Sequence, residues 1–199
     1  MSLKDDIVKA GDPVLARATQ AVDFALEPSL KGLVDRLKAT LSQTNGVGIS
    51  ANQIAENERV CWVEVTSAAI DRIGHEVAKA RSQEIVEGYA LVNGTILEHS
   101  AEQEIWFEGC LSVPGYLAAV RRYRSLTVSG RNIFGEHVSL SVFGWHARIL
   151  QHELDHLDGV LYTDRMMPRT LMTRENYNAQ RRDLSVREIL EGLSGGSSA

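Results

Sequence analysis

The segment His152-Glu153-Leu154-Asp155-His156 combines residue types and a spacing that could carry hydrolytic chemistry. On a helix, residues four apart lie on one face, so His152 and His156 can bind one shared metal ion. Glu153 would then lie beside a metal-bound water, where a carboxylate can act as a general base. The alternative is a pair of polar histidines on a solvated helix, with Glu153 as a surface charge.

The helix that carries this pattern is predicted to be buried. From Trp145 onward, apolar residues recur with helical spacing on several sides, which indicates a helix covered nearly all round. Gly144 stands at its expected start, and Gly159 offers a stop. Because buried histidines need partners, burial favours metal binding over a solvated face.

A catalytic metal centre usually has three protein ligands and one open position. Cys110, between glycine-containing turns, is the best third candidate, because a thiolate and two imidazoles bind Fe(II) and Zn(II) well. The remaining histidines have no comparable setting: His75, His99, His137 and His146.

Composition indicates an ordinary globular protein. The 199 residues are 44% hydrophobic and 24% charged, which predicts a single domain over 1–199 with a real core. A net charge of -5 argues against a nucleic-acid surface, and no apolar run is long enough for a membrane span. Two cysteines and no signal pattern predict a reducing, cytoplasmic location. The last residues, about 194–199, read as a disordered tail.

The elements around the metal helix predict an α+β fold, with antiparallel β-sheets packed around that helix and an N-terminal covering helix. The covering helix begins at Pro28, and leucines recur through Leu41 at its 3.6-residue period. Alternating patterns predict strands over 59–66, 89–92, 95–97, 104–107, 117–129 and 137–142, with a turn at Asn93-Gly94. Three arginines are most simply placed on the solvent face of one strand: Arg121, Arg122 and Arg124.

Three segments together resemble the motifs of the peptide deformylases, and they occur in the family order. They are Gly46-Val47-Gly48-Ile49-Ser50-Ala51-Asn52-Gln53, Glu108-Gly109-Cys110-Leu111-Ser112 and His152-Glu153-Leu154-Asp155-His156. The resemblance extends from Gly11 to about Pro168. The run from Gly144 to Gln151 is similar to the branch of the family that includes the mitochondrial-type (type 1) enzymes.

The resemblance implies metal-dependent hydrolysis of the formyl group from N-formylmethionyl peptides, with release of formate. It implies that Cys110, His152 and His156 bind the metal, preferably Fe(II), with Zn(II), Ni(II) or Co(II) as possible substitutes. Glu153 would act as acid and base. The Gln53 amide and the Leu111 backbone N–H would stabilise the oxyanion.

The same resemblance implies a peptide substrate, in nascent chains at the ribosome, that lies extended along two segments of the protein. Val47, Gly48 and Gly109 would pair with it as neighbouring strands, and the glycines would allow close approach. Candidates for the methionine pocket or its rim are Trp106, Trp145 and Ile149, although core packing explains the tryptophans equally well.

Three positions depart from the family pattern. Ser50 and Asn52 stand in a motif that usually reads Ala-Ala-Pro-Gln, and Leu117 replaces an arginine that is common in bacterial enzymes. A degenerate family member that binds formyl peptides or metal without turnover is therefore one alternative. A zinc peptidase is another, but no histidine follows His156 to serve as its third ligand.

Overall fold

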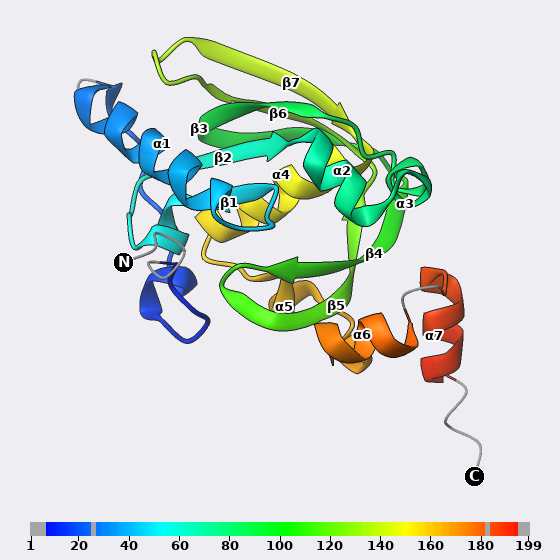
Figure 1. Ribbon diagram of the computed structural model, residues 1–199. Helices are drawn as coiled ribbons and strands as arrows, with labels where there is room; N and C mark the ends of the chain where they lie inside the picture. The colour runs from blue at the N-terminus through cyan, green and yellow to red at the C-terminus, as the bar shows by residue number, and fades with distance from the viewer. Residues whose placement is uncertain (1–6, 25–26, 182–183, 195–199) are drawn as a thin grey trace.

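A computed structural model of the chain describes residues 7–24, 27–181 and 184–194 (Figure 1). Its elements form two antiparallel sheets with one long helix, α4 (Gly144–Leu157), between them. The predicted tail at 194–199 lies outside the described residues, apart from residue 194 at the end of the last helix.

The strands divide between a large and a small sheet. The five-stranded sheet has the order β1-β2-β3-β6-β7, and the three-stranded sheet has the order β4-β5-β8. β1 and β4 are therefore edge strands, and each has one side free of strand pairing. The bounds are β1 (Gly48–Ser50), β2 (Val60–Val65), β3 (Val86–His99), β4 (Gln103–Cys110), β5 (Val113–Tyr123), β6 (Ser125–Arg131), β7 (His137–Phe143) and β8 (Met172–Thr173).

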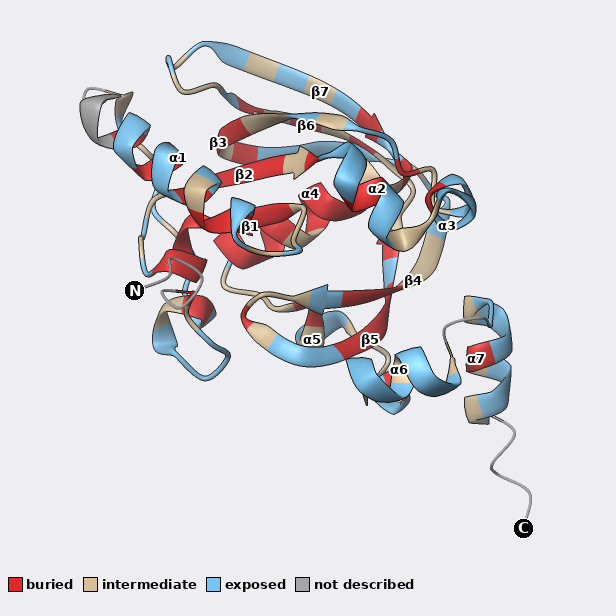
Figure 2. Ribbon diagram, viewed as in Figure 1, coloured by how far each residue is buried: buried red, intermediate tan, exposed pale blue. Residues whose placement is uncertain are grey.

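Helix α4 is the buried centre of the fold. Every residue from Ala147 to Leu157 except His152 is buried, and the helix contacts β1, β2 and β3 of the large sheet and β5 of the small sheet (Figure 2). This arrangement confirms the predicted α+β architecture with antiparallel sheets around the central helix.

The remaining helices pack around the two sheets. α1 (Glu27–Ser42) packs Leu33 and Leu37 against Ile49 and Val60 of the large sheet, which confirms the N-terminal covering helix. The others are α2 (Ser67–Ile73), α3 (His75–Ala80), α5 (Tyr162–Arg165), α6 (Arg174–Gln180) and α7 (Val186–Ser194), with 3₁₀ turns at Pro13–Ala16, Ala51–Ile54 and Pro168–Thr170.

Two predicted strand boundaries are wrong. Asn93-Gly94 is not a turn, because β3 continues through it with a shift of register between Val92 and Thr95. Asn93 adopts a φ of 52°, and its side chain is fixed there by hydrogen bonds with both the N–H and the carbonyl of Val22. The predicted strand over 117–129 is two strands, since the chain passes from the small sheet to the large one between β5 and β6.

Among the described residues, no helix is both long enough and apolar enough to cross a membrane.

Candidate metal centre

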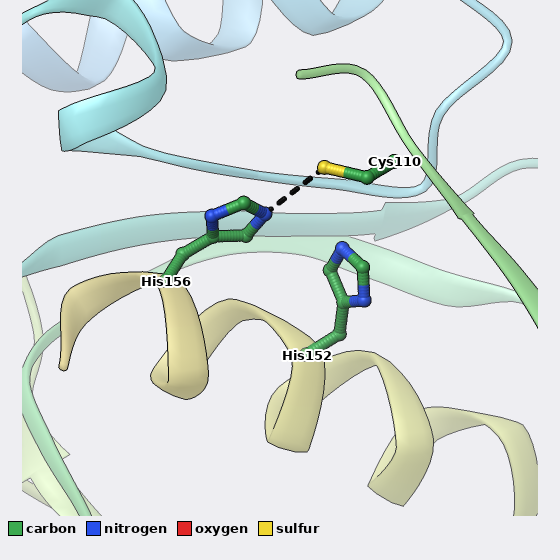
Figure 3. A group of neighbouring side chains, drawn as sticks. All are labelled: Cys110, His152 and His156. Carbon is green, nitrogen blue, oxygen red and sulfur yellow. Dashed lines mark hydrogen bonds between the residues drawn. The ribbon is translucent and has the colours of Figure 1, made fainter. Parts of the chain in front are cut away.

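The three predicted metal ligands come together between the sheets. The side chains of Cys110, His152 and His156 offer ligand atoms that all lie within 4.8 Å of one another (Figure 3). Cys110 Sγ is 3.1 Å from His156 Nε2. The cysteine comes from the end of edge strand β4, and both imidazoles project from one face of α4.

The chemistry of these side chains fits a transition metal. His152 Nδ1 is 3.0 Å from the Glu108 carboxylate, which leaves Nε2 for a metal. Burial lowers the pKa of His156 well below its usual value, so this imidazole is neutral, as a ligand must be. Two N–H groups donate to the Cys110 sulfur: the Ser112 backbone N–H at 3.3 Å and the Gln53 amide at 3.5 Å. One cysteine sulfur and two imidazoles form a donor set with room for one further ligand.

Glu153 is held beside these ligands by the first motif. The Ser50 hydroxyl donates to Glu153 Oε2 at 2.7 Å and also reaches the Glu153 carbonyl. On the other side of the carboxylate, a Cβ at position 48 would lie 2.4 Å from Glu153 Oε1. Only glycine at this position leaves enough space for the carboxylate. Burial raises the pKa of Glu153, while His152 and the Ser50 hydrogen bond oppose that rise. A raised carboxyl pKa suits a group that both accepts and returns a proton near neutral pH.

Gln53 is oriented with its amide nitrogen toward the ligand group. Its Oε1 accepts from the Ser50 backbone N–H at 2.9 Å, and its Nε2 donates to Ser112 Oγ at 3.1 Å. Leu111 follows Cys110 directly. Within the described part of the chain, its backbone N–H has no hydrogen-bond acceptor, so it is free to bind a ligand.

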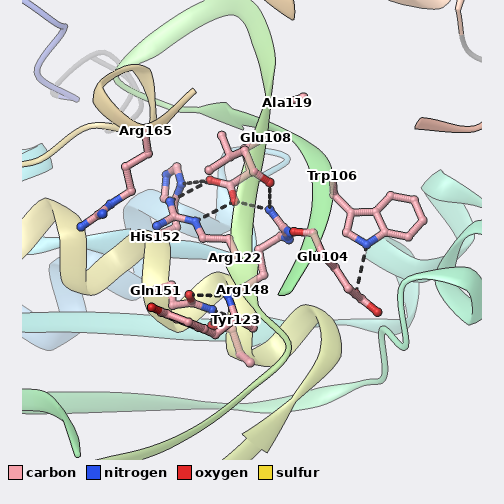
Figure 4. A network of polar contacts seen from close by, with 12 residues as sticks. Glu104, Trp106, Glu108, Ala119, Arg122, Tyr123, Arg148, Gln151, His152 and Arg165 are labelled. Carbon is pink, nitrogen blue, oxygen red and sulfur yellow. Dashed lines mark hydrogen bonds and ion pairs between the residues drawn. The ribbon is translucent and has the colours of Figure 1, made fainter. Parts of the chain in front are cut away.

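His152 contacts a buried network of charged side chains (Figure 4). Glu108 accepts from Arg122 Nε and Nη2 at 3.0 Å each and from Arg148 Nη1 at 2.6 Å, while its Oε2 also meets His152. Burial alone would raise the pKa of Glu108, but Arg122 and His152 outweigh it and hold that pKa well below its usual range. Glu108 is therefore ionised at neutral pH, and its hydrogen bond orients the His152 ring.

Arg122 was predicted on a solvent face, and this is wrong. Its side chain is only 4% exposed, and it bridges Glu108 and Asp155. Asp155 also pairs with Arg165 and accepts no bond from either ligand histidine, so its partners are arginines. The sequence did carry a signal: Arg121 and Arg122 are adjacent on a strand, so one of them had to point inward.

Asn52, which departs from the family pattern, has a structural partner on α4. Its side-chain amide donates to the His156 carbonyl at 2.5 Å, and the residue is fully buried. The first motif thus contacts α4 twice, through Ser50 at Glu153 and through Asn52 at His156. Neither contact was predicted, because sequence spacing does not reveal which segments pack on α4.

The predicted substrate residues lie in several places. Gly48 is on β1, against Glu153. Val47, Trp145 and Ile149 belong to one apolar cluster with residues of α4 and the large sheet. Trp106 lies near Trp145, with the Arg81 guanidinium 5.4 Å and 4.3 Å from the two rings respectively. Gly109 lies apart from both, on β4, one residue before Cys110.

Comparison with known proteins places these features in a family. A Cys/His/His donor set beside a buried carboxylate is the arrangement of a mononuclear metal site with an open position. The family model for polypeptide deformylase matches residues 4–171. The chain is 38% identical over 173 residues to peptide deformylase 1A, chloroplastic/mitochondrial, of Arabidopsis thaliana, with 86% of this chain and 64% of that protein covered. It is 40% identical over 166 residues to peptide deformylase 1 of Streptomyces coelicolor, with 83% and 74% covered.

Solved structures agree with the sequence relatives. The class I type b peptide deformylase of Acinetobacter baumannii, in its Met-Ala-Ser-bound crystal structure, is similar with a TM-score of 0.71 and 32% identity. The match covers 80% of this chain and 96% of that one. The chain therefore belongs to the peptide deformylase family. It spans just under two thirds of the length of two plant relatives, 64% and 62%.

Proposed function

We propose that this protein is a peptide deformylase, which hydrolyses the formyl group of N-formylmethionyl peptides and releases formate and a free amino terminus. The observation that carries the proposal is the meeting of the Cys110, His152 and His156 ligand atoms within 4.8 Å beside the buried carboxylate of Glu153.

The metal that these three residues would hold is Fe(II), with Zn(II), Ni(II) and Co(II) as substitutes. When bound there, a divalent ion lowers the pKa of a water molecule and polarises the formyl oxygen. The chain's own residues supply the rest. Glu153 takes the proton of the attacking water and returns it to the leaving amine, while Ser50 keeps its carboxylate in position.

Gln53 and Leu111 would stabilise the negative oxygen that develops as the water attacks. The Gln53 amide nitrogen is directed toward Cys110, and the Leu111 N–H is adjacent to the same ligand. Removal of one such donor costs about 3–4 kcal/mol of barrier in other enzymes.

The peptide would lie between the two edge strands, β1 with Gly48 and β4 with Gly109, and pair with them as an added strand. Val47, Trp145 and Ile149 would form the apolar wall for the methionine side chain, with Trp106 at the rim. We also propose that nascent chains at cytoplasmic ribosomes are the physiological substrate. Two free cysteines support such a reducing location.

The test is formate release from formyl-Met-Ala-Ser by protein purified anaerobically with Fe(II). The proposal predicts stoichiometric formate and free Met-Ala-Ser. Cleavage of the internal bonds of unformylated peptides would instead indicate a peptidase. Tight binding of the formylated peptide without formate would indicate a degenerate member of the family.

A further inference from the structure

Arg174 places an unpaired positive charge at the edge of the small sheet. It is the first residue of α6, and its Nη2 lies 2.8 Å from the position that a Cβ on Gly109 would occupy. The residue is exposed, and among the described residues no acceptor or carboxylate pairs with its guanidinium. Gly109 is adjacent to Cys110, so this charge lies at the end of β4 that carries one of the proposed metal ligands.

The surrounding structure fixes Arg174 in this place. The preceding strand β8 pairs with β5, with Thr173 opposite Tyr116 and Met172 opposite Leu117. The Thr173 hydroxyl caps α6 by accepting from the Asn176 N–H at 3.1 Å. These contacts hold the backbone on both sides of Arg174 in place.

Leu117 itself brings no charge to this edge. Leu117 is 4% exposed and packs with Phe107 and Ile189 under the C-terminal helices. A charged side chain at 117 would be buried there without a partner, which is unfavourable. Arg174 lies beyond residues 4–171 that match the family model, and it brings a positive charge to the same edge from another element.

We propose that Arg174 determines substrate specificity by favouring an acidic side chain in the residue directly after formylmethionine. The inference rests on the proposed function, in which the peptide is extended along the edge of β4 at Gly109. Side chains of an extended peptide alternate between faces. With the methionine directed toward α4, the next side chain points to the outer face, where Arg174 lies.

The expected size of the effect follows from the exposure of the guanidinium. An exposed ion pair changes kcat/KM by about 2- to 5-fold, and salt screens it. The preference should therefore be present at low ionic strength and weaken at high salt.

The experiment compares three amidated peptides, formyl-Met-Glu-Ser, formyl-Met-Gln-Ser and formyl-Met-Lys-Ser, on the iron-loaded protein. Amidation removes the terminal carboxylate as a competing partner. The variants are Arg174→Glu and the matched control Arg169→Glu, because Arg169 is also exposed and lies outside this edge. A glutamate in the first turn of α6 is compatible with the helix dipole, so the variant should fold.

Wild type and Arg169→Glu are expected to prefer the Glu peptide over the Lys peptide, and Arg174→Glu is expected to reverse that order. The inference is overturned if Arg174→Glu keeps the wild-type order, or if it lowers all three rates equally, as a purely structural residue would. The Gln peptide carries no charge at the tested position, so its turnover tests the proposed function separately from the proposed charge preference. If no peptide is deformylated, the proposed function fails and this inference fails with it.

Discussion

The two cysteines, Cys110 and Cys61, have different surroundings, and the surroundings decide what each thiol can do. Cys110 lies at the end of edge strand β4 with its sulfur 3.1 Å from His156 Nε2, whereas Cys61 is fully buried on β2. Substitution of one cysteine therefore serves as a control for substitution of the other.

Replacement of Cys110 by alanine is expected to abolish stable metal binding, since two imidazoles remain from three ligands. Metal content per chain, measured after anaerobic purification with Fe(II), should fall from near one to near zero. Cys61→Ala is expected to keep its metal. Equal metal content in Cys110→Ala and wild type would remove Cys110 from the ligand group.

The thiol of Cys61 is expected to resist alkylation. Burial raises the pKa of Cys61 above that of an ordinary thiol, so the nucleophilic thiolate is scarce at pH 8. Mass spectrometry of the folded, metal-free protein after iodoacetamide should find Cys110 modified and Cys61 intact, and both modified in denaturant. Equally fast modification of Cys61 in the folded protein would contradict its burial.

The two histidines of the proposed metal site could be predicted from the sequence, because the helical period alone brings His152 and His156 together. The partners of those ligands could not. Glu108 lies 44 positions before His152, and nothing in the spacing selects it over other carboxylates. Strand alternation does place Glu108 and Cys110 on one face, which is the signal that could have indicated its role.

At the scale of elements, β1 and α4 approach so closely at Gly48 that one methyl group matters. A Cβ there would meet Glu153 Oε1 at 2.4 Å, whereas a Cβ at Gly32 on α1 would meet no atom within 4 Å.

Gly48→Ala is therefore expected to displace the Glu153 carboxylate and to lower kcat by about 100-fold while metal content stays unchanged. Gly32→Ala should leave kcat unchanged and stabilise α1 by about 0.5–1 kcal/mol. Steady-state deformylation together with urea unfolding measures both. An unaffected kcat in Gly48→Ala would show that the position of Glu153 is not critical.

Arg122 joins β4, β5 and α4 through its bonds to Glu108 and Asp155. Arg165 pairs with the same Asp155, but its side chain is 50% exposed. Arg122→Met would leave two buried carboxylates short of a partner and is expected to lower the free energy of unfolding by about 3–5 kcal/mol. Arg165→Met is expected to cost less than about 1 kcal/mol. If both variants lost the same free energy of unfolding in urea, Arg122 would be no more important for stability than Arg165.

The elements themselves were largely predictable where their periodicity is strong, as in α1 and α4. Boundaries failed where tertiary contacts overrode local signals. Asn93 takes a turn-like conformation inside β3 because Val22 binds its side chain, and the alternating pattern over 117–129 conceals the passage between two sheets.

At the scale of the whole molecule, the fold presents two edge strands, β1 and β4, on either side of the ligand residues. The sequence predicted the antiparallel sheets and the central helix. It could not predict which strands would be left unpaired, because strand order depends on contacts distant in sequence. The sequence likewise does not indicate that the C-terminal helices cover Leu117.

The central claim is that Cys110, His152 and His156 hold one metal ion and that Glu153 performs the proton transfers beside it. The most direct test measures metal per chain and formate release on the same preparations of wild type and Glu153→Gln. Metal content is predicted to be equal in the two, while formate release from formyl-Met-Ala-Ser falls by at least about 100-fold in Glu153→Gln. Full activity of Glu153→Gln with its metal in place would contradict the claim.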